Sequence, residues 1–122
     1  MLCTVTKKAD LKILTCKGMV LVDVSSIIRI EAISNYSKIF FTNGKTLVVA
    51  KVLRWFEEIL EDKRFLRIHR THIVNRSFIR DYANGTVRSA SGGTVYLSNG
   101  ECIDVSKRKK PLFLKSWYQP AA

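Results

Sequence analysis

The most informative segment of the chain runs from Phe65 to Arg76 and reads FLRIHRTHIVNR. It holds three arginines and two histidines among apolar residues, and it contains no acidic residue. Extending it to Lys63 and Arg80 adds further basic residues without adding a carboxylate. In a chain of net charge +11, such a segment is typical of a surface that binds a polyanion.

The composition limits the class of protein. A chain of 122 residues has room for one domain with one modest core, and 47% hydrophobic residues are enough to fold it. The 21 basic residues face only 10 acidic ones, which fits nucleic acid or an anionic membrane surface as the partner. The membrane is the weaker interpretation, because the chain has no long apolar run and no basic amphipathic helix. The N-terminus lacks the apolar core of a signal peptide, so we expect a cytoplasmic protein.

The cysteines are Cys3, Cys16 and Cys102, an odd and scattered set without a CxxC pair. This spacing argues against a zinc ribbon or a thioredoxin-type site and is consistent with a reducing compartment. Cys102 is expected to be a small buried hydrophobic residue.

Most of the chain has the pattern of strands joined by tight turns. Turn signals stand at Asn43-Gly44, Asn84-Gly85, Gly92-Gly93 and Asn99-Gly100. Strands are expected at residues 27–32, 36–41, 46–49, 86–88, 94–97 and 101–105. In the first of these, Ile28, Ile30 and Ala32 are expected to share one face. Turns at such close spacing predict antiparallel meanders.

One segment, at about 51–62, has the spacing of a helix. Its apolar residues follow a single helical face and are Val52, Leu53, Phe56, Ile59 and Leu60. The residues expected on the solvent side are Arg54, Glu57, Glu58, Glu61 and Asp62. Trp55 is expected at the edge of the apolar face. Because phosphates would repel this acidic face, the helix is expected to support the core, and any DNA must be read by loops and strand ends.

A second basic cluster, Lys107 to Lys110, follows an expected strand directly. It could be a solvated tail. However, Pro111 is expected to interrupt regular structure, and apolar residues within 111–122 are expected to fold back onto the domain; they are Leu112, Phe113, Leu114 and Trp117. A basic run that is anchored on both sides is better suited to binding than a free tail.

Residues 27–109 resemble the LytTR family, the DNA-binding output domain of many bacterial response regulators in two-component systems. The resemblance rests on four blocks in the same order: Ile30-Glu31-Ala32 with Asn35-Tyr36; the helix with Leu53, Phe56 and Leu60; Phe65-x-Arg67-x-His69-Arg70-Thr71-x-Ile73-Val74-Asn75; and Leu97-Ser98-Asn99-Gly100 with Ile103-x-Val105-Ser106-Lys107. It covers about two thirds of the chain.

The resemblance implies a mainly β fold, an elongated stack of small antiparallel sheets with one main helix. Residues 27–110 would form the DNA-binding domain, after an N-terminal extension or leading strands at 1–26. The function implied is sequence-specific binding of double-stranded DNA for transcription regulation, with loops in successive major grooves of direct-repeat promoter sites. The domain would be a monomer in solution and fill two repeats on DNA. A receiver or sensory module could precede it in a longer parent protein.

The resemblance also implies which residues contact DNA. The base-reading positions fall at Ser37, Arg70, and Lys107 or Arg108. Arg70 is chemically the best of them, because a guanidinium can bind guanine O6 and N7 together. Residues expected to contact the DNA backbone or to shape the loops are Asn35, Tyr36, Lys38, Arg67, His69, Thr71, Asn75, Arg76, Lys109 and Lys110.

Other functions have less support. His69 and His72 could suggest a metal site, but no Cys, Asp or Glu is placed to complete one, and in a single strand they would face opposite sides. His69 is expected to hydrogen-bond locally. We expect no cofactor and no enzyme activity, because no phosphate loop, HExxH or nucleophile elbow is present.

The main alternative is an RNA-binding or ribosome-associated β protein. It would display aromatic residues on an open sheet to stack bases, and Phe40, Phe41, Tyr82 and Tyr96 are the candidates. A third possibility is a protein-interaction domain whose charge serves only solubility.

Overall fold

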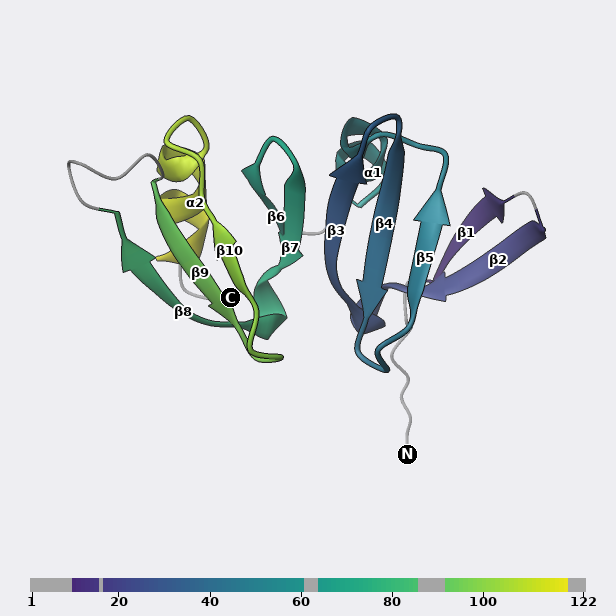
Figure 1. Cartoon of the computed structure of the whole chain (residues 1–122), viewed down its shortest axis with the longest axis horizontal. Helices are drawn as coiled ribbons and strands as arrows, with labels where there is room; N and C mark the ends of the chain where they lie inside the picture. The colour runs from purple at the N-terminus through teal and green to yellow at the C-terminus, as the bar shows by residue number, and fades with distance from the viewer. Residues whose placement is uncertain (1–9, 16, 61–63, 86–91, 119–122) are drawn as a thin grey trace.

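The computed structural model describes residues 10–15, 17–60, 64–85 and 92–118. Figure 1 shows an elongated body in which short antiparallel sheets follow one another along the long axis. A two-stranded sheet is formed by β1 (Asp10–Thr15) and β2 (Gly18–Asp23). The mainly β fold of small stacked antiparallel sheets is therefore confirmed.

The central sheet has five strands in the order β5-β4-β3-β7-β6. Its strands are β3 (Ile27–Ile33), β4 (Tyr36–Phe41), β5 (Thr46–Val49), β6 (Phe65–His69) and β7 (His72–Asn75). A three-stranded sheet follows in the order β10-β9-β8, with β8 (Ile79–Asn84), β9 (Gly93–Leu97) and β10 (Cys102–Asp104). The expected strand at residues 86–88 lies outside the described residues.

Two clusters of buried side chains replace the single core that the chain length suggested. The first lies between the β1–β2 hairpin, strands β3 to β5 and helix α1 (Leu53–Ile59), and it contains Ile13, Ile30, Ile39 and Phe56. The second lies between the β6–β7 hairpin, the three-stranded sheet and helix α2 (Lys110–Trp117), and it contains Ile68, Val74, Val95 and Phe113. Strands β3 and β7 join the two halves of the molecule.

A β-bulge explains how β3 serves both cores. The register of β3 on β4 shifts between Ile27 and Arg29, so the chain takes in one extra residue at Ile28. Ile27 and Ile30 then belong to the first cluster, and Ile28 belongs to the second. The prediction that Ile28 and Ile30 share a face is wrong for this reason.

Helix α1 is shorter than the predicted 51–62. Val52 is extended and precedes the helix, and residues 61–63 lie outside the described residues. Leu53, Phe56 and Leu60 are buried as expected, whereas Val52 and Ile59 remain exposed. The solvent-facing residues Arg54, Glu57 and Glu58 are exposed, and Trp55 packs at the edge of the first cluster.

Helix α2 was not predicted, and Pro111 does not interrupt regular structure. The proline lies in the first turn of the helix, where its missing N–H has no intrahelical partner to lose. Phe113 is buried in the second cluster, with Leu114 and Trp117 packed against it. These three positions have the i, i+1, i+4 spacing of a helical face, which was the signal available in the sequence.

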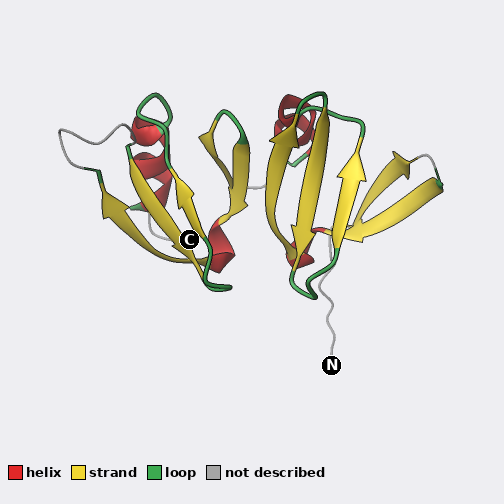
Figure 2. Cartoon of the chain, in the orientation of Figure 1, coloured by secondary structure: helices red, strands yellow, loops and turns green. Residues whose placement is uncertain are grey.

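The predicted hairpin turns at Asn43-Gly44 and Asn99-Gly100 are confirmed. Gly44 and Gly100 take left-handed φ values of 84° and 93°, which glycine adopts without a Cβ clash. Each preceding asparagine accepts a hydrogen bond from the amide two residues on, Lys45 at 2.9 Å and Glu101 at 3.0 Å. Figure 2 shows that these turns lie at the same long edge of the body, with the short 3-10 helices η1 (Val24–Ser26) and η2 (Arg76–Phe78).

Cys102 is exposed on β10, so the prediction that it is buried is wrong. It lies on the strand at the edge of the three-stranded sheet, and its buried neighbour Ile103 points the other way into the second cluster. Cys3 and Cys16 lie outside the described residues. Within the described part of the chain, neither α1 nor α2 is long and apolar enough to cross a bilayer.

Candidate nucleic-acid interface

Three turns gather at the edge opposite the glycine turns, at the top of Figure 1. They are the β3–β4 turn at residues 34–35, the β6–β7 turn at residues 70–71, and the β10–α2 turn at residues 105–109; together we call them the loop edge. The amide of Ala32 donates to Thr71 O at 2.9 Å, and the amide of Ser106 donates to Ile68 O at 2.8 Å. These two bonds tie each outer turn to the central hairpin, so the three turns keep a fixed order.

The β6–β7 turn presents Arg70 to solvent and is held by Arg67. The guanidinium of Arg67 donates from Nε to His69 O at 2.9 Å and from Nη2 to Arg70 O at 2.6 Å, and it forms an ion pair with Glu57 of α1. Arg67 therefore fixes the backbone of the turn by bonding two of its carbonyl groups. Arg70, whose carbonyl receives one of these bonds, has an exposed side chain.

His69 and His72 lie side by side across the hairpin, with ring centroids 5.9 Å apart. The prediction that they face opposite sides is wrong, because the turn at Arg70-Thr71 makes them cross-strand partners. His69 Nδ1 accepts from the Thr71 amide at 3.2 Å, which confirms the expected local bond. The Thr71 hydroxyl lies within 2.8 Å of His69 Nδ1 and 2.9 Å of His72 Nδ1. Burial lowers the pKa of His72, although the nearby carboxylate of Glu31 opposes this shift.

The β3–β4 turn exposes Asn35 and Tyr36, and Ser34 at its tip takes a left-handed φ of 56°. Ser37 is different: its side chain is 0% exposed, and its hydroxyl donates to Lys51 O at 2.6 Å. The prediction that Ser37 reads a base must be corrected. Ser37 faces the first core, because side chains alternate along a strand and Tyr36 and Lys38 take the other face.

The β10–α2 turn exposes Lys107 and Arg108, whereas Lys109 and Lys110 are half-buried. Ser106 organises this turn: its carbonyl accepts from the amide of Lys110 at 2.9 Å, and its hydroxyl oxygen accepts from the amide of Lys109 at 3.1 Å. The basic cluster thus lies in an ordered turn that leads into α2 and is not a free tail.

The remaining residues of the basic stretch lie away from the loop edge. Asn75 is buried, donates to Ile27 O at 2.9 Å and accepts from the amide of Ser77 at 2.9 Å, so it shapes the backbone at η2. Arg76 donates to Trp117 O at 2.8 Å and thereby holds the end of α2. Residues 65–76 do not form one basic surface, because β6 runs toward the loop edge and β7 runs away from it.

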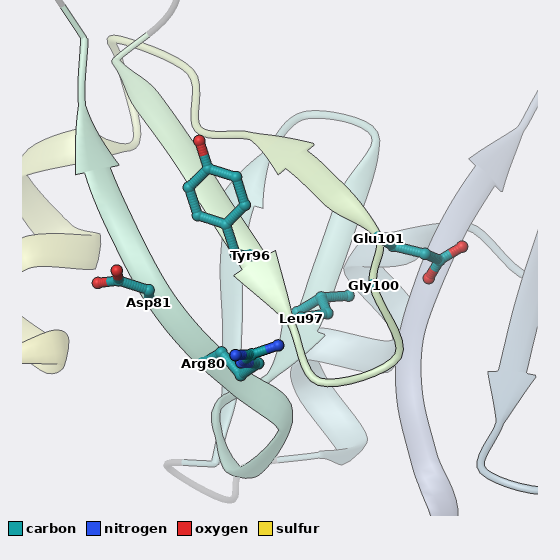
Figure 3. A pocket seen from close by; sticks show the side chains of 6 residues that line it. All are labelled: Arg80, Asp81, Tyr96, Leu97, Gly100 and Glu101. Carbon is teal, nitrogen blue, oxygen red and sulfur yellow. The ribbon is translucent and has the colours of Figure 1, made fainter.

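Arg80 lies beside a hollow of about 390 Å³ on the three-stranded sheet. Figure 3 shows its lining, with Tyr96 on β9 and Glu101 at the β9–β10 turn. It contains none of the residues that were predicted to contact DNA.

Two basic residues were missed by the sequence analysis. Lys51 is exposed at the end of β5, on the loop edge, with its ammonium 5.4 Å from the Trp55 ring. Arg29 is only 7% exposed and pairs with Glu31 and Glu101. Burial alone would lower the pKa of Arg29, but its hydrogen bonds to these two carboxylates raise it. The same bond to Arg29 lowers the pKa of Glu101.

The aromatic residues do not form an open stacking surface. The Arg29 guanidinium covers Phe40 at 3.7 Å, Phe41 packs on the first cluster, and Tyr82 packs against Phe113 with centroids 5.0 Å apart. Tyr96 is 40% exposed. Within the described residues, no group of three or more His, Cys, Asp or Glu side chains could hold a metal ion.

Comparisons with known proteins match most of the chain to one family of domains. Residues 17–117 match the model of the LytTr DNA-binding domain, a span that includes β2 and α2. A solved LytTr DNA-binding domain from a Bacillus cereus protein, described as a methyl-accepting/DNA response regulator, is 25% identical. It superimposes with a TM-score of 0.76 over 93% of this chain and 100% of its own. No curated protein matches. The chain belongs to the LytTR family of DNA-binding domains.

Proposed function

We propose that this domain binds double-stranded DNA in a sequence-specific manner through its loop edge, with the three turns entering successive major grooves of a direct-repeat site. The observation that carries the proposal is the hydrogen-bonded alignment of three turns on one edge, two of which expose basic side chains. Family membership supports DNA binding for transcription regulation. The direct repeat and the residue assignments are the finer part of the proposal.

The roles follow from exposure. Arg70, Lys107 and Arg108 are exposed at the turns and are the proposed base readers. Asn35 and Tyr36 take the place of Ser37 at the first turn, where their side chains are exposed. Lys38, Lys51, Lys109 and Lys110 are proposed to contact phosphates, which position the protein without reading sequence. Arg67, His69 and Thr71 shape the β6–β7 turn, whereas Asn75 shapes the backbone at η2.

The RNA-binding alternative is not supported by the positions of the candidate aromatic side chains. RNA modules stack bases on aromatic side chains of an open sheet. Here Phe40 is covered by Arg29, and Phe41 and Tyr82 pack on the two cores. We therefore favour duplex DNA.

The test is selection of bound duplexes from a random pool, followed by gel shifts on the enriched duplex, a scrambled duplex and single-stranded RNA of the same sequence. The proposal expects an enriched sequence that contains a direct repeat and binds at least tenfold more tightly than the scrambled duplex. Equal binding to all three ligands would contradict it. Preference for the RNA would support the alternative. Enrichment of a single site without a repeat would contradict only the direct-repeat part of the proposal.

A further inference from the structure

We propose that Arg29 and Glu101 form a clamp that fixes the spacing between the β3–β4 turn and the other two turns of the loop edge. Arg29 would then be a positioning residue for DNA recognition, although it never touches DNA. The inference rests on the proposed function, because spacing matters only if the turns act on one DNA site.

The need for a clamp follows from the two halves of the molecule. The β3–β4 turn belongs to the half built on the first cluster, and the β10–α2 turn belongs to the half built on the second. The β6–β7 hairpin places Ile68 and Val74 in the second cluster and Ile73 in the first. Between the halves, β3 pairs with β7 at Arg29↔Val74, Ile30↔Ile73 and Glu31↔His72. A ladder this short can twist, and any twist would move the first turn relative to the other two.

The clamp adds a contact between the halves outside the β3–β7 ladder, as the Arg67–Glu57 ion pair also does. Arg29 lies on β3, whereas Glu101 lies in the β9–β10 turn, 72 positions further along the chain. Arg29 Nε donates to Glu101 Oε1 at 2.9 Å, and Nη2 donates to Oε2 at 3.0 Å. In Figure 3 the Glu101 carboxylate points away from its own sheet toward β3. Two parallel bonds between planar groups fix orientation as well as distance.

Both partners of the clamp are themselves held in place. Arg29 donates from Nη1 to Glu31 at 2.8 Å and stacks on Phe40. Glu101 Oε1 accepts from the Asn99 amide group at 2.8 Å. An apolar contact could stabilise this junction equally well, but it would not define an angle between the halves. The arrangement is therefore better explained by geometry than by stability.

The test uses the DNA site obtained by selection. One base pair is inserted or deleted between the two parts of the site that the two halves of the domain protect in a footprinting experiment. The wild-type domain is expected to lose at least tenfold in affinity on either altered site. Glu101→Ala and Arg29→Met are expected to lose less than threefold on them, although both bind the original site more weakly. The two substitutions change the net charge in opposite directions, so a shared effect cannot come from charge.

Asp104→Ala is the matched control, because it removes an exposed carboxylate from the adjoining strand, and it should keep the wild-type spacing penalty. A second readout needs no DNA. In both clamp variants, hydrogen exchange of the Ala32 amide, which bonds across the junction to Thr71 O, should accelerate at least fivefold. The Thr42 amide, which bonds to Ser26 O within the first half, should not change.

The inference is overturned if the clamp variants retain the tenfold spacing penalty, if the wild-type domain has no such penalty, or if Ala32 exchange is unaltered. Failure of the proposed function looks different, because no duplex would be selected while the exchange experiment could still succeed. If Arg29→Met does not fold, Glu101→Ala, which truncates a partly exposed side chain, decides both measurements.

Discussion

Arg67 and Arg70 are three positions apart and have opposite surroundings. The guanidinium of Arg67 is half-buried and donates to two carbonyls of the turn, while the side chain of Arg70 is exposed at its tip. Holding the backbone of the turn in this way reduces the entropy that Arg70 must lose on binding. One arginine is thus expected to prepare the turn and the other to contact the base.

Arg70→Ala is expected to cost about 1–3 kcal/mol on the selected site and to relax preference at one or two base positions. Affinity for scrambled DNA should fall much less. Arg80→Ala is the control, because it removes the same exposed charge away from the loop edge. Gel shifts on singly substituted sites measure the effect. Equal losses on specific and scrambled DNA would reduce Arg70 to a phosphate contact.

The burial of His72 predicts a pH-dependent stability. Because its folded-state pKa lies below the ordinary value of about 6.5, the unfolded chain binds a proton more readily than the folded one. The free energy of unfolding should therefore be highest above pH 6.5 and decrease as the pH falls toward the folded-state pKa. Glu101, whose pKa is also lowered, adds a second loss only below roughly pH 4.3.

Urea denaturation at pH 7.5 and pH 5.5 checks this expectation. His72→Gln, which cannot be protonated, should reduce the difference between the two free energies of unfolding. A variant that keeps the whole wild-type difference would show that another group is responsible.

At the scale of elements, the β10–α2 turn shows how a basic run becomes a structured surface. Ser106 is fixed to β6 by its amide and caps the following turn with its carbonyl and hydroxyl. Phe113 then anchors α2 in the second core. Lys107 and Arg108 are left exposed at the bend, with Lys109 and Lys110 partly covered beside them.

The double variant Lys109→Ala, Lys110→Ala is expected to weaken binding to the selected site and to scrambled DNA about equally. It should also flatten the dependence of log K on log salt by roughly one to two units, because each lost phosphate contact removes about 0.9 of the slope. Lys107→Ala and Arg108→Ala should instead lower the ratio of affinities for selected and scrambled DNA. Their effect on the slope of log K against log salt should be smaller. Titrations at three salt concentrations decide this. If neither single variant alters base preference, the whole cluster is electrostatic.

At the scale of the whole molecule, one group of exposed apolar side chains lies on the β1–β2 hairpin. Leu14, Met19 and Leu21 are 71%, 63% and 61% exposed on the outer face of the β1–β2 hairpin. A stable protein interface uses about 20–30 residues on each side, so this patch is too small to hold a dimer by itself. Neither described helix is long enough to supply a coiled coil.

We therefore expect the free domain to be a monomer and two copies to occupy one direct-repeat site. Light scattering at micromolar concentration should give the mass of one chain, and the complex with DNA should contain two. A stable dimer without DNA would contradict this expectation. In that case Leu21→Asp, a change on the hairpin face, would show whether the β1–β2 patch forms the dimer.

Local chemistry made much of this molecule predictable from its sequence. Asn-Gly pairs specify tight turns, because asparagine bonds its own backbone and glycine accepts a left-handed φ. The spacing of Leu53, Phe56 and Leu60 specifies a helix with one apolar face. The excess of basic residues predicts a polyanionic partner, and the motif from Phe65 to Asn75 identifies the family. The turns, the helix and the motif depend on residues that are close in sequence, and the charge excess depends on composition alone.

The packing of the folded chain was needed to show which of those residues are exposed at the loop edge and which are buried. Alternation along a strand defines two faces, but the sheet or helix that covers one of them comes from elsewhere in the chain. This is why Ser37 is buried, Cys102 is exposed, and the bulge at Ile28 turns neighbouring isoleucines toward different cores. The alignment of three turns and the Arg29–Glu101 clamp likewise join residues far apart in sequence. Such contacts form only when the two halves pack together, because the pairing of distant strands determines which side chains meet.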